Sequence, residues 1–126
     1  MSGIKYLLDT NFVIGLLKAA PEVVTIANQH VILAAECAYS AITRMELLGY
    51  PGIDSDEESL ISQKLANFRH LGISPEIEDR VIGLRRTRRI KLPDAIIAAT
   101  VIHHQLRLLT LDQQLQAVVT EARPGP

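Results

Sequence analysis

Short apolar runs alternate along this chain with longer stretches in which apolar residues recur at helical spacing. Short apolar runs are typical of buried strands, and apolar residues three or four positions apart are typical of amphipathic helices. Strands are predicted at residues 5–8, 37–41, 70–74 and 107–110. Because helical stretches separate these strands, the pattern predicts an α/β fold with a mainly parallel sheet.

Helix start signals mark the stretches between the strands. Some begin with a proline suited to the first helical turn, and two begin with a capping-box pattern, Thr43 with Glu46 and Ser55 with Glu58. The stretch at 30–35 fits either a strand or a helix end. The predicted helices span residues 11–18, 21–29, 43–50, 55–69, 75–88, 93–104 and 112–120.

The predicted helix at 93–104 has apolar residues around almost its whole circumference. A helix that is apolar on all sides is a buried helix. Its first turn nevertheless carries a carboxylate, Asp94. This mismatch marks Asp94 as a candidate functional residue.

Composition predicts one folded domain. Of the 126 residues, 48% are apolar and 21% are charged, as in ordinary globular proteins. We expect the domain to cover residues 1–120, and the proline-containing segment 121–126 to form a disordered tail. The formal net charge of -1 excludes a general basic field, so any binding of nucleic acid depends on local patches.

Cysteine, apolar and aromatic content narrow the class of protein further. The single cysteine, Cys37, excludes an intrachain disulfide and a cysteine-based zinc site, and is typical of a cytoplasmic protein. No apolar run approaches the roughly 20 residues of a membrane helix, so we expect no membrane contact. Three Tyr, two Phe and no Trp are too few for a base-stacking RNA platform.

Four acidic residues have similar places in the predicted fold, because each lies after a strand or near the start of a helix. They are Asp9, Glu46, Asp94 and Asp112. In an open α/β sheet, the carboxyl ends of the strands and the helix starts that follow them form one rim, where ligands bind. We therefore expect the four carboxylates to converge.

Each acid also has a simpler explanation as a helix cap. Glu46 completes a capping-box pattern, and an acid near a helix N-terminus stabilises the helix by about 0.3–1 kcal/mol. Four carboxylates on one rim, however, repel one another unless a cation neutralises them. Mg²⁺ or Mn²⁺ suits such oxygen ligands, orients a phosphodiester and lowers the pKa of an attacking water.

Four segments resemble, in the same order, the acidic motifs of PIN-domain ribonucleases. They read LLDTN at 7–11, SAITRMEL at 40–47, LPDAIIAA at 92–99 and LTLD at 109–112. The resemblance covers about residues 4–119 and is closest to VapC-type toxins of toxin–antitoxin pairs. It implies a three-layer α/β/α sandwich with a short, mainly parallel sheet, and a Mg²⁺- or Mn²⁺-dependent endoribonuclease.

The resemblance also assigns roles to residues and implies partners. Asp9, Glu46 and Asp94 match the acidic core of the family's metal site, and Asp112 matches its most variable member. Asn11 and Thr110 lie beside these acids and are expected to orient carboxylates or water by hydrogen bonding. The implied partners are an RNA substrate, a cognate antitoxin and a second copy of the chain in a homodimer.

A basic run precedes Asp94. It places five of the thirteen basic residues within seven positions: Arg85, Arg86, Arg88, Arg89 and Lys91. One interpretation is a solvated helix end, since cations there are favourable through the helix dipole. The other is a phosphate-binding patch that brings RNA to the acids, with the four arginines as candidate contacts.

Two alternatives fit parts of the pattern. A phosphoacceptor receiver domain also places acids and Mg²⁺ at a sheet edge, but it needs adjacent acids after the first strand and a lysine on a late strand. This chain has Asp9 alone and no lysine at 107–110. A catalytically silent PIN-like scaffold is the closer alternative.

His103 and His104 are adjacent on a predicted helix, so they are not a metal-binding pair at i, i+4 spacing.

Overall fold

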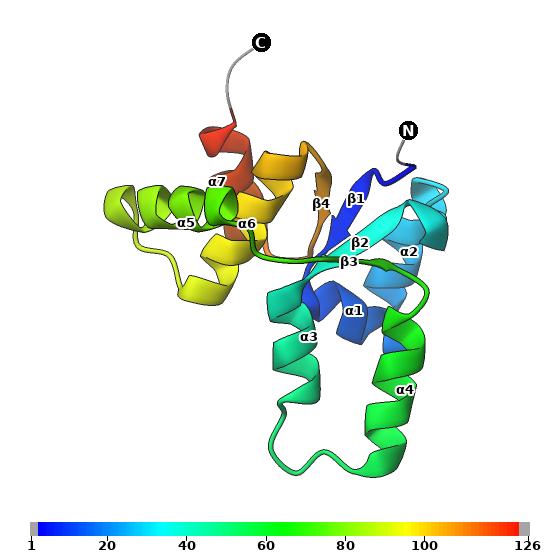
Figure 1. Ribbon diagram of the computed structural model, residues 1–126. Coiled ribbons are helices and arrows are strands. Elements are labelled where there is room, and N and C mark those ends of the chain that lie inside the picture. Colours follow the sequence, from blue (N-terminus) through cyan, green and yellow to red (C-terminus); the bar gives the residue numbers. More distant parts are fainter. Residues whose placement is uncertain (1–2, 124–126) are drawn as a thin grey trace.

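The computed structural model describes residues 3–123 and contains one four-stranded sheet (Figure 1). Its strands are β1 (Tyr6–Leu8), β2 (Cys37–Ser40), β3 (Arg69–Leu71) and β4 (Arg107–Leu109). They are ordered β3-β2-β1-β4, and every neighbouring pair is parallel. The predicted α/β class with a parallel sheet is confirmed.

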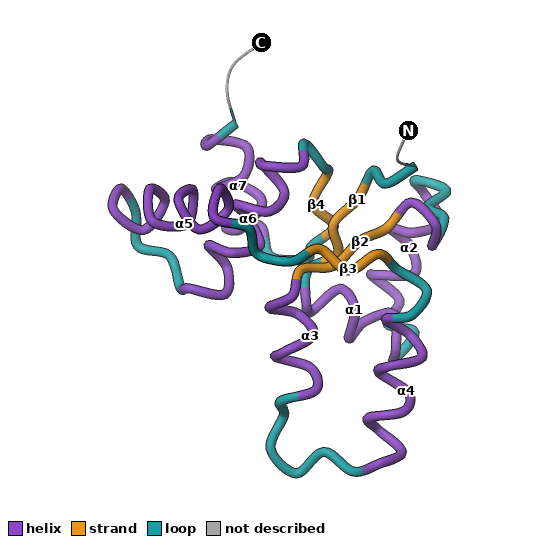
Figure 2. The backbone as a smooth tube through the Cα atoms, viewed as in Figure 1, coloured by secondary structure: helices purple, strands orange, loops and turns teal. Residues whose placement is uncertain are grey.

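Helices make up most of the chain, and the strands between them are short (Figure 2). A 3₁₀ turn at Ala34–Glu36 precedes β2, and residues 30–35 contain no strand. The helices are α1 (Thr10–Leu17), α2 (Pro21–Gln29), α3 (Ala41–Leu48), α4 (Ser55–Leu65), α5 (Pro75–Thr87), α6 (Leu92–His104) and α7 (Gln113–Ala122).

Successive residues of a strand point to opposite faces of a sheet, and in this protein they enter two separate cores. Leu7 of β1 packs in a core with buried residues of α5, α6 and α7. Its neighbours Tyr6 and Leu8 pack in a second core with buried residues of α1, α2 and α4. Helices therefore cover both faces, and the predicted three-layer α/β/α sandwich is confirmed.

α6 is the central helix of its layer. It packs against both α5 and α7, and all of residues 95–102 are buried. This confirms the prediction from its apolar pattern. The buried length of α6 fixes the position of its first turn, which carries Asp94.

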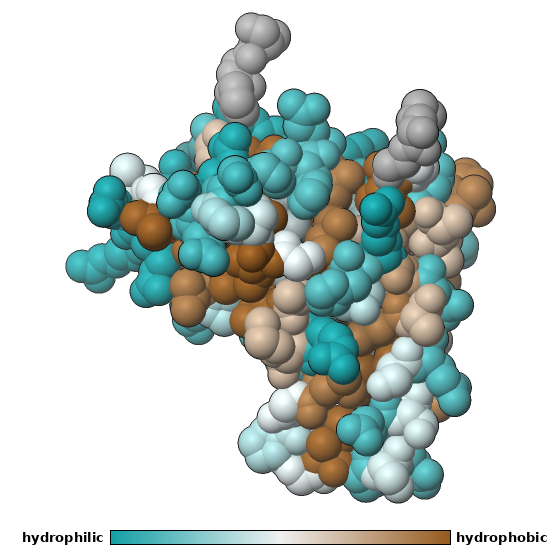
Figure 3. Space-filling model, in the orientation of Figure 1, coloured by the Kyte–Doolittle hydropathy of each residue, from teal (hydrophilic) through white to brown (hydrophobic). Residues whose placement is uncertain are grey.

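α3 and α4 project from the sheet as an arm (Figure 1). The space-filling view shows apolar surface along this arm (Figure 3). Large apolar side chains are exposed on it at Met45, Tyr50 and Leu60, each more than half exposed at 52%, 64% and 61%. The arm therefore carries exposed apolar surface.

Both predicted capping boxes are wrong, although the helices exist. Ser40 caps α3, where its hydroxyl accepts a hydrogen bond from the Ile42 N–H at 3.2 Å. Thr43 is buried inside that helix instead. Asp54 caps α4 and forms the capping box with Glu57. In both cases the residue just before the helix has the extended backbone that a cap needs.

Three element ends also differ from the prediction. α4 ends at Leu65 rather than near residue 69, and β3 spans Arg69–Leu71 rather than 70–74. α7 continues through Ala122, into the segment expected to form a tail, while residues 124–126 lie outside the described part of the chain. Within residues 3–123 no single helix is long and apolar enough to cross a membrane, and the one pair that passes by length and composition, α1 with α2, is bent by 102°.

Candidate metal centre

The four acids lie where strands end and helices begin. Asp9 directly follows β1 and caps α1, and Asp112 follows β4 and caps α7. Glu46 is on α3, the helix after β2, and Asp94 is in the first turn of α6. The charges of Glu46 and Asp112 act on Asp9, and those of Asp9 and Asp112 act on Asp94. The fold therefore gathers acids from four distant segments at one end of the sheet.

Asp9 is the most enclosed of these acids, at 5% exposure. Its Oδ1 accepts a hydrogen bond from the Thr10 N–H, and its Oδ2 accepts one from the Thr110 hydroxyl, both at 2.7 Å. These hydrogen bonds favour the ionised form, but burial outweighs them and raises the pKa of Asp9. Repulsion from Asp112 and Glu46 raises this pKa further.

Glu46 is held by a pair of threonine hydroxyls. The Thr10 hydroxyl donates to Glu46 Oε1 at 2.8 Å, and the Thr10 and Thr43 hydroxyl oxygens are 2.9 Å apart. Because the one Thr10 hydroxyl proton goes to the carboxylate, Thr43 is the donor in the second hydrogen bond. The capping-box explanation of Glu46 is therefore wrong, and its carboxylate is oriented by a residue of α1.

Asp112 is a helix cap and a part of the acidic rim at once. Its Oδ1 accepts hydrogen bonds from the N–H groups of Gln114 and Leu115 at 3.0 and 3.1 Å. Its own N–H donates to the Thr110 hydroxyl at 2.9 Å. Since the same hydroxyl donates to Asp9, the start of α7 holds the group that orients Asp9.

Asp94 is half-buried, and within residues 3–123 its carboxylate has no recorded hydrogen bond or ion pair. The residue that caps α6 is Lys91, without a side-chain hydrogen bond. Burial raises the pKa of Asp94, Asp9 and Asp112 raise it further, and Lys91 opposes them. Asp94 therefore caps no backbone N–H among the described residues, although it lies in the first turn of α6, where a carboxylate is favourable through the helix dipole.

The residues at this rim fit a hard divalent cation by their chemistry. The donors are carboxylate and hydroxyl oxygens, and among the described residues no Lys, Arg or His forms an ion pair with Asp9 or Asp94. No group of three His, Cys, Asp or Glu residues within 3–123 is close enough to enclose a metal ion. An open arrangement suits Mg²⁺, which usually keeps several waters and takes only one or two carboxylates.

Of the two residues expected to orient the acids, Thr110 donates a hydrogen bond to Asp9. Asn11 is exposed and makes no recorded side-chain hydrogen bond in the described part of the chain, whereas Thr10 connects Asp9, Glu46 and Thr43. One signal was available: Thr10 directly follows the acid at the start of a helix, and Thr43 lies three residues before Glu46 on one helical face.

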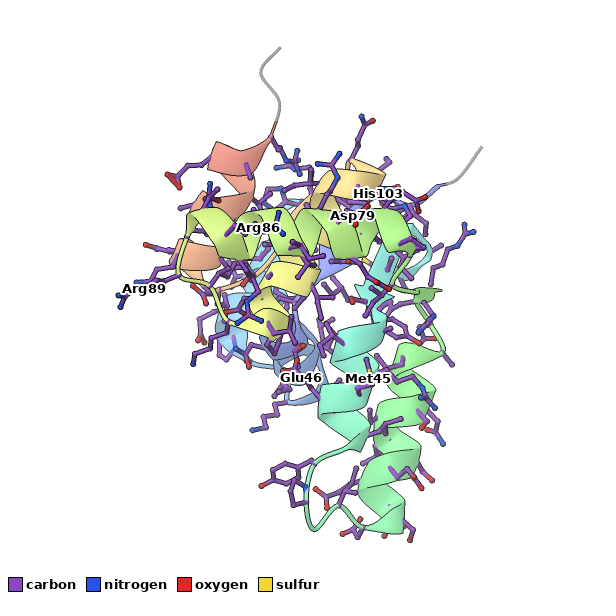
Figure 4. All side chains as sticks on the ribbon, turned by 60° about the vertical axis from the view of Figure 1, so that its left-hand side comes forward. Met45, Glu46, Asp79, Arg86, Arg89 and His103 are labelled. Atoms are coloured by element: carbon purple, nitrogen blue, oxygen red, sulfur yellow. The ribbon has the colours of Figure 1, made fainter. Side chains whose placement is uncertain are left out.

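The basic run lies at the end of α5 and in its connection to α6. Arg85 and Arg86 are exposed in the last turn of α5, and Arg89 projects outward, away from Glu46 (Figure 4). Arg88 differs from the other three, because it is half-buried and its guanidinium is 3.7 Å from the Glu121 carboxylate. Three of the four arginines are therefore free to meet an anionic ligand.

Neither the cysteine nor the adjacent histidine pair is part of the acidic rim. Cys37 is buried, and burial raises the pKa of its thiol to about 11, so that it stays protonated. His103 and His104 contact one another at the end of α6 opposite Asp94. A carboxylate-based site is what the geometry offers.

Two hollows reach this rim. A hollow of about 680 Å³ between α1, α3 and α4 is lined by Thr10 and Glu46 together with apolar residues of the arm. A second, of about 450 Å³, follows β4 between α2 and α7 and is lined by Thr110. The first hollow is thus lined by one of the acids, and the second only by the threonine that bonds Asp9.

The fold and the acidic rim define a class of small α/β domains with a carboxylate site at the carboxyl end of a parallel sheet. The sequence model of the PIN domain matches residues 6–120. The chain therefore belongs to the PIN domain family. No curated protein sequence matches it.

Solved structures of similar fold include a toxin–antitoxin complex. One chain of a toxin–antitoxin complex from Klebsiella pneumoniae is 32% identical, with a TM-score of 0.73, and the match covers 87% of this chain and 88% of that one. FitAcB from Neisseria gonorrhoeae is 25% identical, with a TM-score of 0.70, covering 91% and 93%. VapBC2 from Rickettsia felis, bound to a promoter DNA fragment, shares the fold at 19% identity, with a TM-score of 0.74 and coverage of 91% and 93%.

Proposed function

We propose that this protein is a metal-dependent endoribonuclease and the toxin of a toxin–antitoxin pair. One observation carries the proposal: Asp9 is 5% exposed and repelled by neighbouring acids, without a cationic partner among the described residues. Membership of the PIN domain family supports a nuclease, and the similarity to chains of toxin–antitoxin complexes supports the toxin role. We expect the protein to act in the cytoplasm.

Asp9 and Asp94 are the residues we assign to the metal first, because their carboxylates are the most strained by burial and mutual repulsion. Asp112 and Glu46 complete the acidic environment. A bound Mg²⁺ or Mn²⁺ supplies polarisation of a phosphodiester and activation of water for its hydrolysis. Thr110 and Thr10 keep Asp9 and Glu46 in fixed orientations through their hydrogen bonds.

Arg85, Arg86 and Arg89 are the residues we propose to contact RNA phosphates. They are exposed and have no recorded ion pair within residues 3–123, so their charge is available to a phosphate backbone. Arg88 is a weaker candidate because Glu121 already pairs with it. The arginines offset the repulsion that the acidic rim exerts on an approaching polyanion.

An antitoxin is the second proposed partner. The hollow between α1, α3 and α4 has apolar walls, including Ile14, Leu47 and Leu60, and it ends at Glu46. An amphipathic antitoxin helix fits such a groove, and an antitoxin arginine beside the acids would compete with the metal, since a guanidinium pairs with carboxylates bidentately. Inhibition should then weaken as Mg²⁺ is raised. Equal inhibition at low and saturating Mg²⁺ would contradict this competition.

A homodimer is the third part of the proposal. Its contact is expected to use apolar helix faces within the first seventy residues. The exposed Met45 on α3 belongs to such a face. Light scattering at micromolar concentration tests this directly, because a monomer alone would contradict it.

The main experiment joins metal binding to RNA cleavage. Purified protein is incubated with a fluorescent single-stranded RNA in Mg²⁺, Mn²⁺ or EDTA, beside a Glu46→Gln variant purified identically. Because Glu46 is exposed, this variant is expected to fold. Cleavage is expected only for the unaltered chain with metal, and cleavage in excess EDTA would overturn the metal mechanism.

A second readout separates an enzyme from a silent scaffold. Metal that binds only the folded state raises the melting temperature by mass action. Stabilisation by Mg²⁺ together with cleavage supports the proposed nuclease. Stabilisation by Mg²⁺ without cleavage of any RNA tested would favour the catalytically silent scaffold.

A further inference from the structure

The free edge of β4 offers unpaired backbone groups. β4 pairs with β1 alone within the described residues. The Arg107 N–H donates to the Lys5 carbonyl at 2.9 Å, and the Leu109 carbonyl accepts from the Asp9 N–H at 3.0 Å. Because alternate residues of a parallel strand bond to the same neighbour, the N–H and carbonyl of Leu108 point away from β1.

This edge lies in the floor of a groove rather than on an open surface. The hollow of about 450 Å³ that follows β4 is lined on one side by α2 and its C-cap, through Ile26 and His30, and on the other side by α7, through Val119 and Thr120. Both helical layers therefore extend past the last strand. The space between two layers beyond an edge strand has the position of an additional strand.

The charge of the groove favours an acidic occupant. Arg107, Arg123 and His30 line it, and no Asp or Glu is among its lining residues. None of these three forms an ion pair with a described residue. Arg123 donates a hydrogen bond to the Leu106 carbonyl, at the beginning of the edge, and leaves Leu108 uncovered.

An extended peptide suits these features better than RNA does. A peptide strand supplies one N–H and one carbonyl to Leu108 and places alternate side chains toward α2 and α7. RNA phosphates satisfy the arginines and the Leu108 N–H, but a donor for the Leu108 carbonyl has to come from a separate 2′-hydroxyl or base, whereas a peptide strand carries donors and acceptors at the spacing of β4.

We propose that the groove along β4 binds an extended, acidic segment of a partner protein, which joins the sheet as a fifth strand. The contact is independent of the proposed nuclease activity and of the groove between α1, α3 and α4. It places the partner segment between α2 and α7, with its carboxylates against Arg107 and Arg123 and one end beside Thr110.

A short fluorescent peptide of alternating valine and glutamate tests the proposal by anisotropy. We expect saturable binding, and about tenfold weaker binding when the residues facing β4 are N-methylated or when lysine replaces glutamate. Arg107→Glu is expected to weaken binding by a similar factor. Arg44→Glu, an equally exposed change on α3 away from this groove, is expected to leave it unchanged.

Hydrogen exchange followed by NMR locates the contact. The peptide should slow exchange of the Leu108 N–H, and Thr120→Tyr, an exposed change that fills the groove, should abolish that protection. If the N-methylated peptide binds as tightly as the unmodified one, the proposed strand addition is wrong. Strong protection of Leu108 in the free protein would show that the chain covers its own edge. Protection by single-stranded RNA but not by the peptide would assign the groove to nucleic acid, and each result would contradict the proposal.

Discussion

The first turn of α6 carries a half-buried carboxylate, whereas the remainder of the same helix is buried and almost entirely apolar. Residues 95–102 are all buried and apolar except Thr100, whose hydroxyl donates to the Ile96 carbonyl at 2.6 Å. Asp94, one residue earlier, is a half-buried carboxylate without a partner in the described part of the chain, and its pKa is raised. One part of the helix maximises stability and the other opposes it.

This difference separates the part of α6 that stabilises the fold from the part that destabilises it. Apolar burial along α6 stabilises by roughly 25 cal/mol per Å² removed from water. Carboxylates held close together are destabilising until a cation neutralises them. Functional sites commonly oppose stability in this way. Substitutions in the two parts of α6 should therefore affect different measurements.

The largest effect is expected at Asp94. Asp94→Asn should lower RNA cleavage by about 100-fold or more, because a ligand of the proposed metal is lost. The melting temperature in EDTA should stay the same or rise, since a repelled charge is removed. Cleavage assays and thermal melting in EDTA measure the two quantities. A variant that melts much lower and still cleaves RNA would show that Asp94 is structural.

Ile97, one turn further along α6, should show the reverse behaviour. It is 1% exposed, and Ile97→Ala should lower the free energy of unfolding by about 2–5 kcal/mol, through lost burial and the cavity left behind. Ile82→Ala on α5 is the matched control, because Ile82 is 46% exposed. Urea denaturation measures both. Equal losses for the two variants would mean that α6 is not the centre of its layer.

The sequence predicted the elements well because their signals are local. Apolar periodicity identified α6 as buried, and serine and proline at residues 74 and 75 marked the start of α5. The order of strands across the sheet depends on long-range pairing, and the pattern of short apolar runs carries no information about it. The family resemblance implied the sandwich, and the pairing β3-β2-β1-β4 completed it.

The acids and one of their hydrogen-bond partners, Thr110, were selected from sequence, but the partners Thr10 and Thr43 were not. The Thr110 hydroxyl meets Asp9 across 101 positions, and the Thr10 hydroxyl meets Glu46 across 36. Such contacts depend on side-chain direction at the sheet end, which composition and spacing do not determine. Thr43 was assigned to a helix cap because capping boxes are recognised by short patterns that also occur inside helices.

A smaller effect is expected from the threonines that hold the acids. Thr110→Val keeps the side-chain volume but removes the hydrogen bond to Asp9. This bond lowers the pKa of Asp9, so its loss should raise that pKa further and weaken metal binding by about 10–100-fold. Titration of Mg²⁺ by thermal shift measures the change. Thr87→Val, which removes a hydroxyl bonded only within α5, should leave metal binding unaltered.

The smallest effect is expected in the dependence of stability on pH. Burial, Asp9 and Asp112 raise the pKa of Asp94 above its ordinary value of 3.8. Between 3.8 and the raised value, the folded protein retains a proton that the unfolded chain has lost, so stability falls as pH rises through this window. Asp94→Asn should therefore melt at the same temperature as the unaltered protein below the window and at a higher temperature at neutral pH, both in EDTA. The difference isolates Asp94 and the acids coupled to it, because the exposed Lys5–Glu36 pair contributes equally to both proteins. In saturating Mg²⁺ at neutral pH, the unaltered protein should instead melt at the higher temperature, because it keeps the proposed metal ligand. A difference that is the same at every pH would show that the charge of Asp94 does not oppose folding, and the contrast between the two parts of α6 would then fail.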